Sequence, residues 1–566
     1  MKYHRIRSIQ HIWMVITLVT SLLASHSRAS ERRTPSGIPA PKLVLVITID
    51  GLPQDQVLKY YDQLGEGGFK RLLEQGAWFD DAHHGHATTY TAVGHATILT
   101  GAYPYRHGIV GNDWWDRATQ KKVYCCADPS STILGEPTTE NAGTSPRNLQ
   151  VTTVGDELRL ATGMQSKVLS VSLKDRGAIL TGGKTGTAYW FSKDTGRFVT
   201  STYYAKDYPD WWKSFDAGKP QDKWLDKIWD PLLPSEAYWQ SMVDGCASGR
   251  GYRLNIGIGA RFPHIMGGNK YYDELRWTPF GDDYTLEFLF TAIKAENLGK
   301  NPHGVPDLVA VSFSCHDEIN HLFGPESKQS QDDLLRLDKT LAALFTAVDQ
   351  WVGLDRVLLT LTADHGFPNS PEFFRDSLHF ETGRIDPENL LADLNAALGK
   401  KFGEAKYAVM WLNPTISLDP AVIAAKGLKH EDVENAAAEF LQDYPGIHTV
   451  FTRSQLLNGN LPPTRFGLLA TRSWHRQLGG DLFVIQKQGW YLYNESDEYC
   501  TTHGSPWSYD THVPLILMGS NWIKPGEYGQ AVEVVDLAPT LSTILGVRFP
   551  TGAEGHVLHE ILRQDR

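Results

Sequence analysis

Three long apolar runs predict the core of the fold. They are KLVLVITID (42–50), PDLVAVSFSCHD (306–317) and DRVLLTLTADH (355–365), which are nearly continuous and rich in β-branched residues. Such runs are typical of strands that are buried on both faces, as in a parallel sheet covered by helices. Helical patterns follow the first and second runs, at residues 56–76 and 332–353. This alternation predicts an α/β fold with a central, mostly parallel sheet flanked by helices.

Two stretches depart from this alternation. Residues 190–290 are rich in aromatic residues and loops and short of long periodic segments, so we expect an insertion that caps one edge of the core rather than an independent domain. Residues 385–475 include one helical pattern, HEDVENAAAEFLQDY, and we expect them at the periphery of the core. The length of 566 residues suits one large α/β domain with insertions, or two to three ordinary domains.

The N-terminal residues have the pattern of an export signal. A basic stretch, MKYHRIRSIQH, precedes an apolar run at 12–24 that is too short for a membrane span, and Ser27 and Ala29 form a small-x-small cleavage site. We therefore expect residues 1–29 to be a signal peptide that is removed on export to the periplasm or the medium. We expect no membrane association afterwards, because no later segment is long and apolar enough to span a bilayer.

Net charge limits the molecules that this chain can bind, and the number of cysteines limits its disulfides. Removal of the signal peptide takes four basic residues and no acidic ones, which lowers the formal net charge from −11 to −15. An acidic chain repels a polyanion, so nucleic acid is excluded as an extended partner, whereas a small anion can bind where cations are concentrated. Five cysteines are too few for a disulfide scaffold, and their odd number leaves at least one free or paired between molecules. We expect Cys315 to be free and leave open the pairing of Cys125, Cys126, Cys246 and Cys500.

Each of the three apolar runs carries an aspartate at or near its end, namely Asp50, Asp317 and Asp364. In open α/β sheets, ligands bind outside the carboxyl ends of the strands, where these side chains would meet. His321 lies four residues after Asp317, on the same face of a helix, and His365 directly follows Asp364. A single such aspartate is more often a cap or turn residue, but three of them, two with histidine, favour a metal site. Aspartate and histidine ligands without thiolate suit Zn²⁺, and two metals explain the set better than one.

Further polar residues are candidates for the same site. His503 lies in a Gly-Ser-Pro turn before the apolar run VPLILMG, whereas His512 abuts that run and could equally be a core histidine. Lys174 and Arg176 are two apart near a strand end, so we expect both side chains on one side of the chain, with Asp175 pointing away. The pair suits an anion clamp, and a surface loop with a local ion pair is the alternative.

The segment HATTYTAVGHATILTG (86–101) predicts a turn followed by a helix that ends at Gly101. Thr88, Thr89 or Thr91 could each cap its start, because a side-chain oxygen there accepts an unpaired backbone N–H. On this stretch alone, a helix cap is favoured over catalysis. The nearby histidines have no strand-end carboxylate beside them in sequence, so we expect structural or supporting roles for His83, His84, His86 and His95.

Together, these motifs resemble those of the alkaline phosphatase superfamily and, within it, the secreted PafA-type alkaline phosphatases, a type I phosphodiesterase/nucleotide pyrophosphatase-like sequence family. The resemblance covers nearly all of the mature chain and rests on VITIDG, TYTAVGHATILTGAYPYRHGIVGNDWWD, LKDRGAIL, DEINHLFGPES, TADHG, THGSPWSYDTHVPLI and VDLAPTLSTILGVRFPTGAEGHVL. It implies an alkaline phosphatase-like α/β fold, with residues 30–566 as one catalytic domain and the 190–290 insertion within it. One departure is Cys315-His316 before Asp317, where small hydroxylated residues are expected; it bears on sensitivity to oxidation, not on the ligands.

The resemblance also implies two Zn²⁺ ions and a threonine nucleophile. The residues at the matching positions fall into three sets. One ion would be bound by Asp317, His321 and His503. The other would be bound by Asp50, Asp364 and His365, with Thr91 as its fourth ligand and as the nucleophile. The phosphoryl oxygens would be contacted by Asn112, Lys174 and Arg176.

These roles predict a zinc-dependent phosphomonoesterase that acts through a phosphothreonine intermediate and releases inorganic phosphate. The expected partners are small phosphate monoesters, and the chain is expected to be a monomer. A phosphodiesterase or nucleotide pyrophosphatase of the same superfamily is the main alternative; Lys174 with Arg176 favours monoesters, because a monoester dianion presents three non-bridging oxygens to these cations. A non-catalytic metal- or phosphate-binding relative is disfavoured, because every proposed ligand and Thr91 is present. A side activity on sulfate esters or phosphonates is compatible with the same residues.

Overall fold

The computed structural model describes residues 39–241, 244–246, 257–268, 270–492 and 499–563. The predicted signal peptide at 1–29 lies outside these described residues. Within them, no helix has the length and apolar character needed to cross a membrane.

A nine-stranded sheet forms the centre of the molecule, with the strand order β20-β2-β19-β12-β1-β11-β6-β7-β8. The inner strands β12, β1, β11, β6 and β7 pair in parallel, whereas β19 is antiparallel to both of its neighbours and β8 is antiparallel to β7. The predicted α/β class with a mostly parallel sheet is therefore confirmed. The nine strands are β1 (Leu43–Ile49), β2 (Ala77–Phe79), β6 (Val168–Ser172), β7 (Thr187–Phe191), β8 (Phe198–Val199), β11 (Asp307–Phe313), β12 (Val357–Thr362), β19 (Leu515–Met518) and β20 (Gly526–Tyr528).

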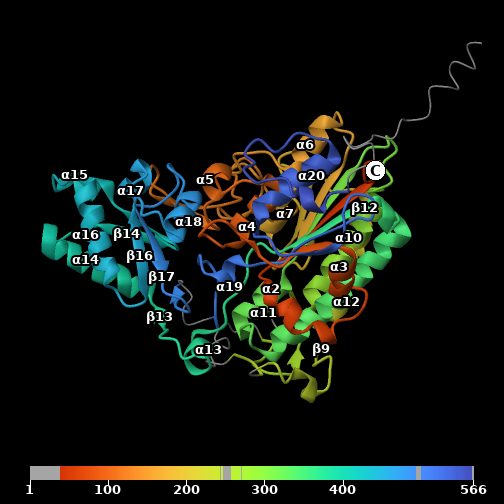
Figure 1. Cartoon of the computed structure of the whole chain (residues 1–566), viewed down its shortest axis with the longest axis horizontal. Coiled ribbons are helices and arrows are strands. Elements are labelled where there is room, and N and C mark those ends of the chain that lie inside the picture. The colour runs from red at the N-terminus through yellow and green to blue at the C-terminus, as the bar shows by residue number, and fades with distance from the viewer. Residues whose placement is uncertain (1–38, 242–243, 247–256, 269, 493–498, 564–566) are drawn as a thin grey trace, which may run out of the picture.

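Helices cover both faces of this sheet (Figure 1). Every residue of β1, β11 and β12 is buried, which explains why their sequences are apolar without alternation. One helical layer contains α4 (Thr91–Thr100), α6 (Val154–Ala161), α7 (Asp175–Gly182) and α20 (Leu537–Leu545). The other contains α3 (Phe69–Gln75), α10 (Phe280–Ala295), α11 (Cys315–Phe323) and α12 (Lys328–Trp351).

Residues 385–475, which we expected at the periphery of the core, instead form most of a second body. Figure 1 shows it beside the large sheet. It has its own hydrophobic cluster, which includes Leu394, Val433 and Val484. The sequence pattern hides this body because its strands are short and one of its central strands comes from residues after 475. Its antiparallel sheet has the order β14 (Ala408–Leu412), β15 (Thr415–Leu418), β17 (Leu482–Gln486) and β16 (Ile447–Thr452), and α14 (Pro387–Phe402) and α16 (His430–Gln442) pack on it.

The aromatic-rich stretch 190–290 packs against the main core. Its strand β8 extends the large sheet at one edge, and the ring of Phe198 in this strand stacks on Phe288 of α10, with 4.3 Å between the ring centroids. Tyr284 packs on the same ring at 5.0 Å. All three rings belong to the main hydrophobic cluster. This stretch therefore completes one edge of the core, and its action as a cap stays a prediction.

Shorter elements lie between the large ones. The short strand pairs are β4 (Asp113–Asp116) with β5 (Lys121–Tyr124), β3 (Ala82–His83) with β21 (Val532–Glu533), β9 (Ile228–Trp229) with β10 (His264–Ile265), and β13 (Arg384–Ile385) with β18 (Tyr491–Leu492). The shorter helices are α2 (Gln54–Lys59), α5 (Pro104–His107), α8 (Asp210–Ala217), α9 (Tyr271–Leu275), α13 (Pro371–Asp376), α15 (Pro420–Ala425), α17 (Arg453–Asn458), α18 (Arg465–Ser473) and α19 (Ser508–Thr511).

Candidate active site

The carboxyl ends of β1, β11 and β12 bring three buried aspartates together. β1 lies between the other two strands and is parallel to both, so all three end at the same edge of the sheet. Asp50, Asp317 and Asp364 follow there and are each at most 1% exposed. Gly51, with φ +71°, allows the close approach, since a Cβ at this position would lie 3.0 Å from atoms of Asp317. The backbone N–H of Gly51 also donates to Asp364 Oδ1 at 3.1 Å.

Three histidines face this cluster, and one ring nitrogen of each already makes a hydrogen bond. Each of them uses Nδ1 to hydrogen-bond a backbone carbonyl oxygen: His321 that of Thr501 (3.1 Å), His365 that of Gly366 (2.9 Å) and His503 that of Thr89 (2.6 Å). Because a carbonyl oxygen only accepts, Nδ1 carries the proton of each neutral ring, and Nε2 presents a lone pair. This is the arrangement in which a histidine binds a metal ion through Nε2.

The Nε2 atoms approach the carboxylates at distances that fit a shared ion better than a hydrogen bond. Four such distances lie between 3.4 and 3.5 Å: His365 Nε2 to Asp50 Oδ1 and to Asp364 Oδ2, His503 Nε2 to Asp317 Oδ1, and His321 Nε2 to Asp317 Oδ2. Two ligand atoms that each lie about 2.1 Å from a tetrahedral ion are about 3.4 Å apart. Among the described residues, Asp50 Oδ1, Asp317 Oδ1 and His365 Nε2 are buried without a hydrogen-bond partner. The donor set therefore fits metal ions of the size of Zn²⁺.

Two groups of ligand atoms are close enough to hold an ion each. One is Asp317, His365 and His503, and the other is Asp50, Asp364 and His365. His365 Nε2 lies between them, 3.8 Å from Asp317 Oδ1. The structure thus gathers all six aspartates and histidines that the sequence marked as candidate ligands. His365 belongs to both groups, whereas His321 belongs to neither and lies 3.5 Å from Asp317 Oδ2.

A third group of this kind, His430, Glu434 and Asp481, lies in the second body. There the guanidinium of Arg117 pairs with the same oxygen of Asp481 that His430 contacts at 2.9 Å. An arginine already neutralises this carboxylate, and the ion pair links the turn of the β4–β5 hairpin to the second body.

Burial and charge set the protonation of the site. Burial and a neighbouring carboxylate raise the pKa of Asp50 well above its usual value. Burial acts in the same direction on Asp317, but the ammonium of Lys174 outweighs it and holds the pKa of Asp317 well below its usual value. Burial lowers the pKa values of His365 and His503, so both imidazoles are neutral. Neutral imidazoles beside buried carboxylates form a donor set that a divalent cation stabilises.

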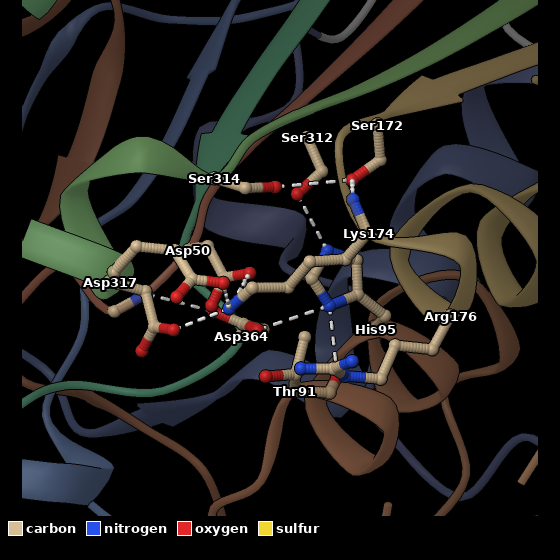
Figure 2. A network of polar contacts seen from close by, with 12 residues as sticks. Asp50, Thr91, His95, Ser172, Lys174, Arg176, Ser312, Ser314, Asp317 and Asp364 are labelled. Atoms are coloured by element: carbon tan, nitrogen blue, oxygen red, sulfur yellow. Dashed lines mark hydrogen bonds and ion pairs between the residues drawn. The ribbon is translucent and has the colours of Figure 1, made fainter. Parts of the chain in front are cut away.

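Thr91 is the first residue of α4, and Tyr90 is the N-cap. The side chain of the N-cap residue makes no hydrogen bond to the helix, so the threonine cap that we considered as the simpler interpretation is not formed. One turn later, Gly94 packs so closely on the strand end that a Cβ there would lie 2.0 Å from the carbonyl oxygen of Asp364. The helix start is therefore held against the aspartates (Figure 2). The helix ends before Gly101, which has φ 62°, as predicted.

His95 ties the start of α4 to the aspartates. Its Nδ1 lies 2.9 Å from the carbonyl oxygen of Thr91 and 3.1 Å from Asp364 Oδ2, and its Nε2 lies 2.9 Å from the hydroxyl of Ser312. This contact agrees with the supporting role expected for His95. Two other histidines of this segment lie outside the cluster of aspartates. His84 hydrogen-bonds the carbonyl oxygen of Ala363, and His83 stacks on His512.

Asn112 reaches the start of α4 from a different element. It directly precedes β4, and its Oδ1 accepts a hydrogen bond of 3.0 Å from the backbone N–H of Ala92. The N-terminus of a helix favours an anion, because its first N–H groups lack intrahelical partners. Asn112 therefore lies next to Thr91, at the start of α4.

The two predicted cations come from the start of α7. Lys174 is the N-cap residue of this helix, and its Nζ lies 2.9 Å from Asp50 Oδ2 and also pairs with Asp317. Glu318, which sequence reasoning missed, lies 3.9 Å from the same Nζ. Arg176 Nε is buried and has no hydrogen-bond partner in the part of the chain that the structure describes. Figure 2 shows the side chains of both cations extending toward the aspartates and Thr91.

The turn that carries His503 is held by Asp510, which sequence reasoning also missed. Asp510 Oδ2 accepts hydrogen bonds from the backbone N–H groups of Gly504 (3.1 Å) and Ser505 (2.8 Å) and from the hydroxyl of Ser505 (2.5 Å). Burial raises the pKa of Asp510 to about 8. In the sequence, this role is marked only by an aspartate a few residues after a Gly-Ser-Pro turn. That pattern is too common to predict that the aspartate holds the turn.

A disulfide between Cys246 and Cys500 anchors the segment that leads to His503. The backbone N–H of Cys500 donates to the carbonyl oxygen of His321 at 2.8 Å, so the bridge also lies beside that candidate ligand. The remaining cysteines, Cys125, Cys126 and Cys315, are free, as predicted for Cys315.

Loss of this disulfide is expected to weaken both folding and metal binding. In a Cys246→Ser/Cys500→Ser variant, we expect the free energy of unfolding to fall by about 2–5 kcal/mol, because a cross-link that closes so long a loop restricts the unfolded chain. Zinc affinity should fall as well, since the segment before His503 loses its anchor. Thermal unfolding and a zinc titration measure the two effects. A Cys126→Ala variant, which keeps the bridge, is the control, and wild-type zinc affinity in the double variant would contradict the anchoring role.

Comparisons with known proteins agree with this architecture. A family model described as type I phosphodiesterase / nucleotide pyrophosphatase matches residues 44–509. Alkaline phosphatase PafA of Elizabethkingia meningoseptica is 35% identical over 556 residues, which cover 97% of this chain and 98% of the relative. Alkaline phosphatase PhoV of Synechococcus elongatus is 34% identical over 536 residues, with 94% of each chain covered. The crystal structure of wild-type alkaline phosphatase PafA matches with a TM-score of 0.85 and 34% identity, over 93% of this chain and all of that chain.

The mostly parallel sheet, with aspartates and histidines gathered at its carboxyl edge, is the architecture of the alkaline phosphatase superfamily, as the match to PafA shows. Within that superfamily, the chain belongs to the type I phosphodiesterase / nucleotide pyrophosphatase family. Its similarity to two proteins named alkaline phosphatases supports a phosphatase.

Proposed function

We propose that this chain is a zinc-dependent phosphomonoesterase that acts through a phosphothreonine intermediate on Thr91 and releases inorganic phosphate. The observation that carries the proposal is the convergence of three buried carboxylates and three histidine Nε2 atoms at the sheet edge against which α4 places Thr91. The names of its relatives add support for a phosphatase, and the two cations at the start of α7 favour a monoester.

Two ions would be held by the six gathered ligands. Asp317, His321 and His503 would hold one, and Asp50, Asp364 and His365 would hold the other, with Thr91 as a further ligand. When bound, such ions act as Lewis acids that lower the pKa of a coordinated hydroxyl or water and neutralise charge on the transferred group. The buried imidazoles are already neutral and oriented, which favours this binding over protonation.

In the first half of the reaction, Thr91 Oγ attacks phosphorus and the bond from phosphorus to the ester oxygen breaks. The hydroxyl proton leaves Thr91, and the leaving group departs as an alcohol once it takes up a proton. Thr91 lies at the N-terminus of α4, where the helix dipole favours the negative charge of the phosphoryl group. Asn112, Lys174 and Arg176 would contact its non-bridging oxygens and hold it in line for attack.

In the second half, water attacks phosphorus, the bond to Thr91 Oγ breaks, and the hydroxyl regains a proton. The products are inorganic phosphate and the free enzyme. The same three contacts stabilise the charge on the non-bridging oxygens again, because the two displacements pass through similar arrangements of the phosphoryl group. Removal of the 1–29 segment on export to the periplasm or the medium, and the capping role of residues 190–290, remain part of the proposal.

We expect this protein to hydrolyse a phosphate monoester in preference to a diester, and to need zinc to do so. A simple aryl phosphate monoester and its matching diester would be assayed with added zinc, after chelation, and after zinc is restored. We expect a large preference for the monoester that is lost on chelation and recovered with zinc. The matching family model is described as a phosphodiesterase, so the contrary outcome is a preference for the diester. That outcome would mean that Lys174 and Arg176 are misassigned. Absence of zinc-dependent turnover of either substrate would contradict the catalytic assignment.

A further inference from the structure

Both carboxylate oxygens of Asp175, the residue between the two predicted cations, are held from outside α7. The phenol of Tyr124, the last residue of β5, donates a hydrogen bond of 2.5 Å to Asp175 Oδ1. The backbone N–H of Gly143 donates to Asp175 Oδ2 at 3.0 Å. The sequence led us to expect that Asp175 would point away from Lys174 and Arg176, and the structure shows that its carboxylate contacts Tyr124 and Gly143.

The contact with Gly143 is close. A Cβ at this position would lie 2.2 Å from Asp175 Oδ2, so a side chain at residue 143 would displace the Asp175 carboxylate from this contact. The same Asp175 Oδ1 that accepts from Tyr124 also accepts from the backbone N–H of Arg176, at 2.7 Å. The phenol of Tyr124 and the main chain of Arg176 are therefore joined through one oxygen atom.

Tyr124 belongs to the same hairpin as another predicted phosphate ligand. In the β4–β5 pair, Tyr124 lies opposite Asp113, which directly follows Asn112. The backbone N–H of Cys125 donates to the carbonyl oxygen of Asn112 at 2.9 Å and closes the hairpin at this end. One short hairpin thus holds Asn112 against α4 and reaches α7 through Tyr124 and Asp175.

The arrangement also leaves the Arg176 guanidinium available for an anion. A carboxylate next to an arginine competes with a bound phosphate for its N–H groups. Here the oxygens of Asp175 accept hydrogen bonds from Tyr124 and Gly143 instead, while Arg176 Nε is buried and has no partner among the described residues. Burial and the adjacent Asp175 raise the pKa of Tyr124 well above its usual value, so the phenol keeps its proton at alkaline pH.

We propose that Tyr124 is a positioning residue of the phosphate clamp: through Asp175 it fixes the first turn of α7 and thereby aims Arg176 at the phosphoryl group of a monoester. This inference rests on the proposed phosphomonoesterase function. Tyr124 itself does not touch the substrate, and it acts on the part of the site that distinguishes a phosphate monoester, or inorganic phosphate, from a diester.

A Tyr124→Phe variant of the zinc-loaded full chain tests the proposal, because it removes only the hydroxyl. We expect kcat/KM for an aryl phosphate monoester to fall about 10-fold, as for the loss of one charge-assisted hydrogen bond. Inhibition by inorganic phosphate should weaken by a similar factor, whereas kcat/KM for the matching diester should change by less than about 2-fold. An Asp175→Asn variant keeps the oxygen that accepts from Tyr124 and should lose less than Asp175→Ala.

The matched control is Tyr203→Phe, because the Tyr203 hydroxyl also donates to a single acceptor, the carbonyl oxygen of Lys184 at 2.8 Å. It should leave both substrates and phosphate inhibition unchanged. Thermal unfolding of both variants separates positioning from a general loss of stability: equal unfolding temperatures with a loss confined to the monoester support positioning. Equal losses for monoester and diester would overturn it.

A double-mutant cycle with Arg176→Ala decides whether Tyr124 acts through Arg176. If it does, Tyr124→Phe should have little effect on monoester hydrolysis once Arg176 is absent. The same fold-loss in both backgrounds would overturn the inference and leave the phosphatase proposal intact. If Arg176→Ala alone leaves monoester hydrolysis and phosphate inhibition unchanged, there is no clamp to position, and the clamp in the proposed function fails together with the inference.

Discussion

Replacing Thr91 with alanine is expected to lower kcat/KM for an aryl phosphate monoester by at least about 10³-fold, because the variant lacks the attacking oxygen. Six of the seven proposed metal ligands are other residues, so we expect zinc still to bind. Steady-state assays of the zinc-loaded variant measure the loss. Acid quenching during turnover, followed by mass spectrometry, should find phosphate on Thr91 in the wild type and none in the variant. A Thr91→Ser variant retains a hydroxyl and should recover part of the activity.

The matched control is Thr88→Ala, three residues earlier in the same segment. The Thr88 hydroxyl is buried and has no hydrogen-bond partner in the described part of the chain, so its removal breaks no bond that the structure shows. We expect wild-type activity from this variant. Unchanged activity of the Thr91→Ala variant would contradict the proposal and indicate a mechanism without a threonine nucleophile. Absence of turnover by both the wild type and the variant would favour a binding protein.

The central sheet could be predicted from sequence because its strands are buried on both faces. The residues of β1, β11 and β12 are all buried, and this leaves an uninterrupted apolar signal in the sequence. The second body gives no such signal. Its sheet is antiparallel and partly exposed, and β17 joins it from beyond the stretch that we considered. Short strands that are paired by distant contacts lack a local pattern to reveal them.

The convergence of the proposed metal ligands could be predicted because strand ends and helix spacing are local features. Asp50 and Asp364 follow apolar strands directly, and Asp317 and His321 share a face of α11. The assignment of Thr91 and Asn112 came from the family resemblance, since a helix cap was the better interpretation of the threonines on residue chemistry alone. The structure adds what favours Thr91, namely its place as the first residue of a helix whose start is held against Asp364.

The supports of the site could not be predicted, because each depends on contacts between distant segments. Asp175 meets Tyr124 and Gly143 across 51 and 32 residues of sequence. Three acceptor contacts at Asp510 hold the His503 turn, and they are recognisable only once the turn is folded. Spacing in the sequence identifies which residues can do chemistry, whereas the hydrogen bonds that orient them arise from the tertiary fold.

Lys174 is expected to have a second role that appears only in the metal-free protein. Its side chain is 6% exposed, and its ammonium lies against the buried carboxylates of Asp50 and Asp317. A Lys174→Met variant keeps the length of the side chain and removes its charge, which leaves those carboxylates uncompensated. Breaking a buried ion pair in this way costs about 3–5 kcal/mol. We therefore expect the free energy of unfolding of the metal-free variant to fall by about that amount.

With zinc bound, the cost of the Lys174→Met substitution should be much smaller, because the ions neutralise the same carboxylates. Monoester hydrolysis by the zinc-loaded variant should still fall by about 10²-fold, since the phosphoryl group loses one charged contact. Denaturant unfolding of the metal-free and zinc-loaded forms measures the difference. The control is Lys213→Met at the surface, where the pair with Asp207 is exposed to solvent and should contribute nothing measurable in either form. If Lys174→Met lowers the free energy of unfolding equally in the metal-free and zinc-loaded forms, the prediction is wrong. The loss depends on zinc only if lysine and zinc neutralise the same carboxylates.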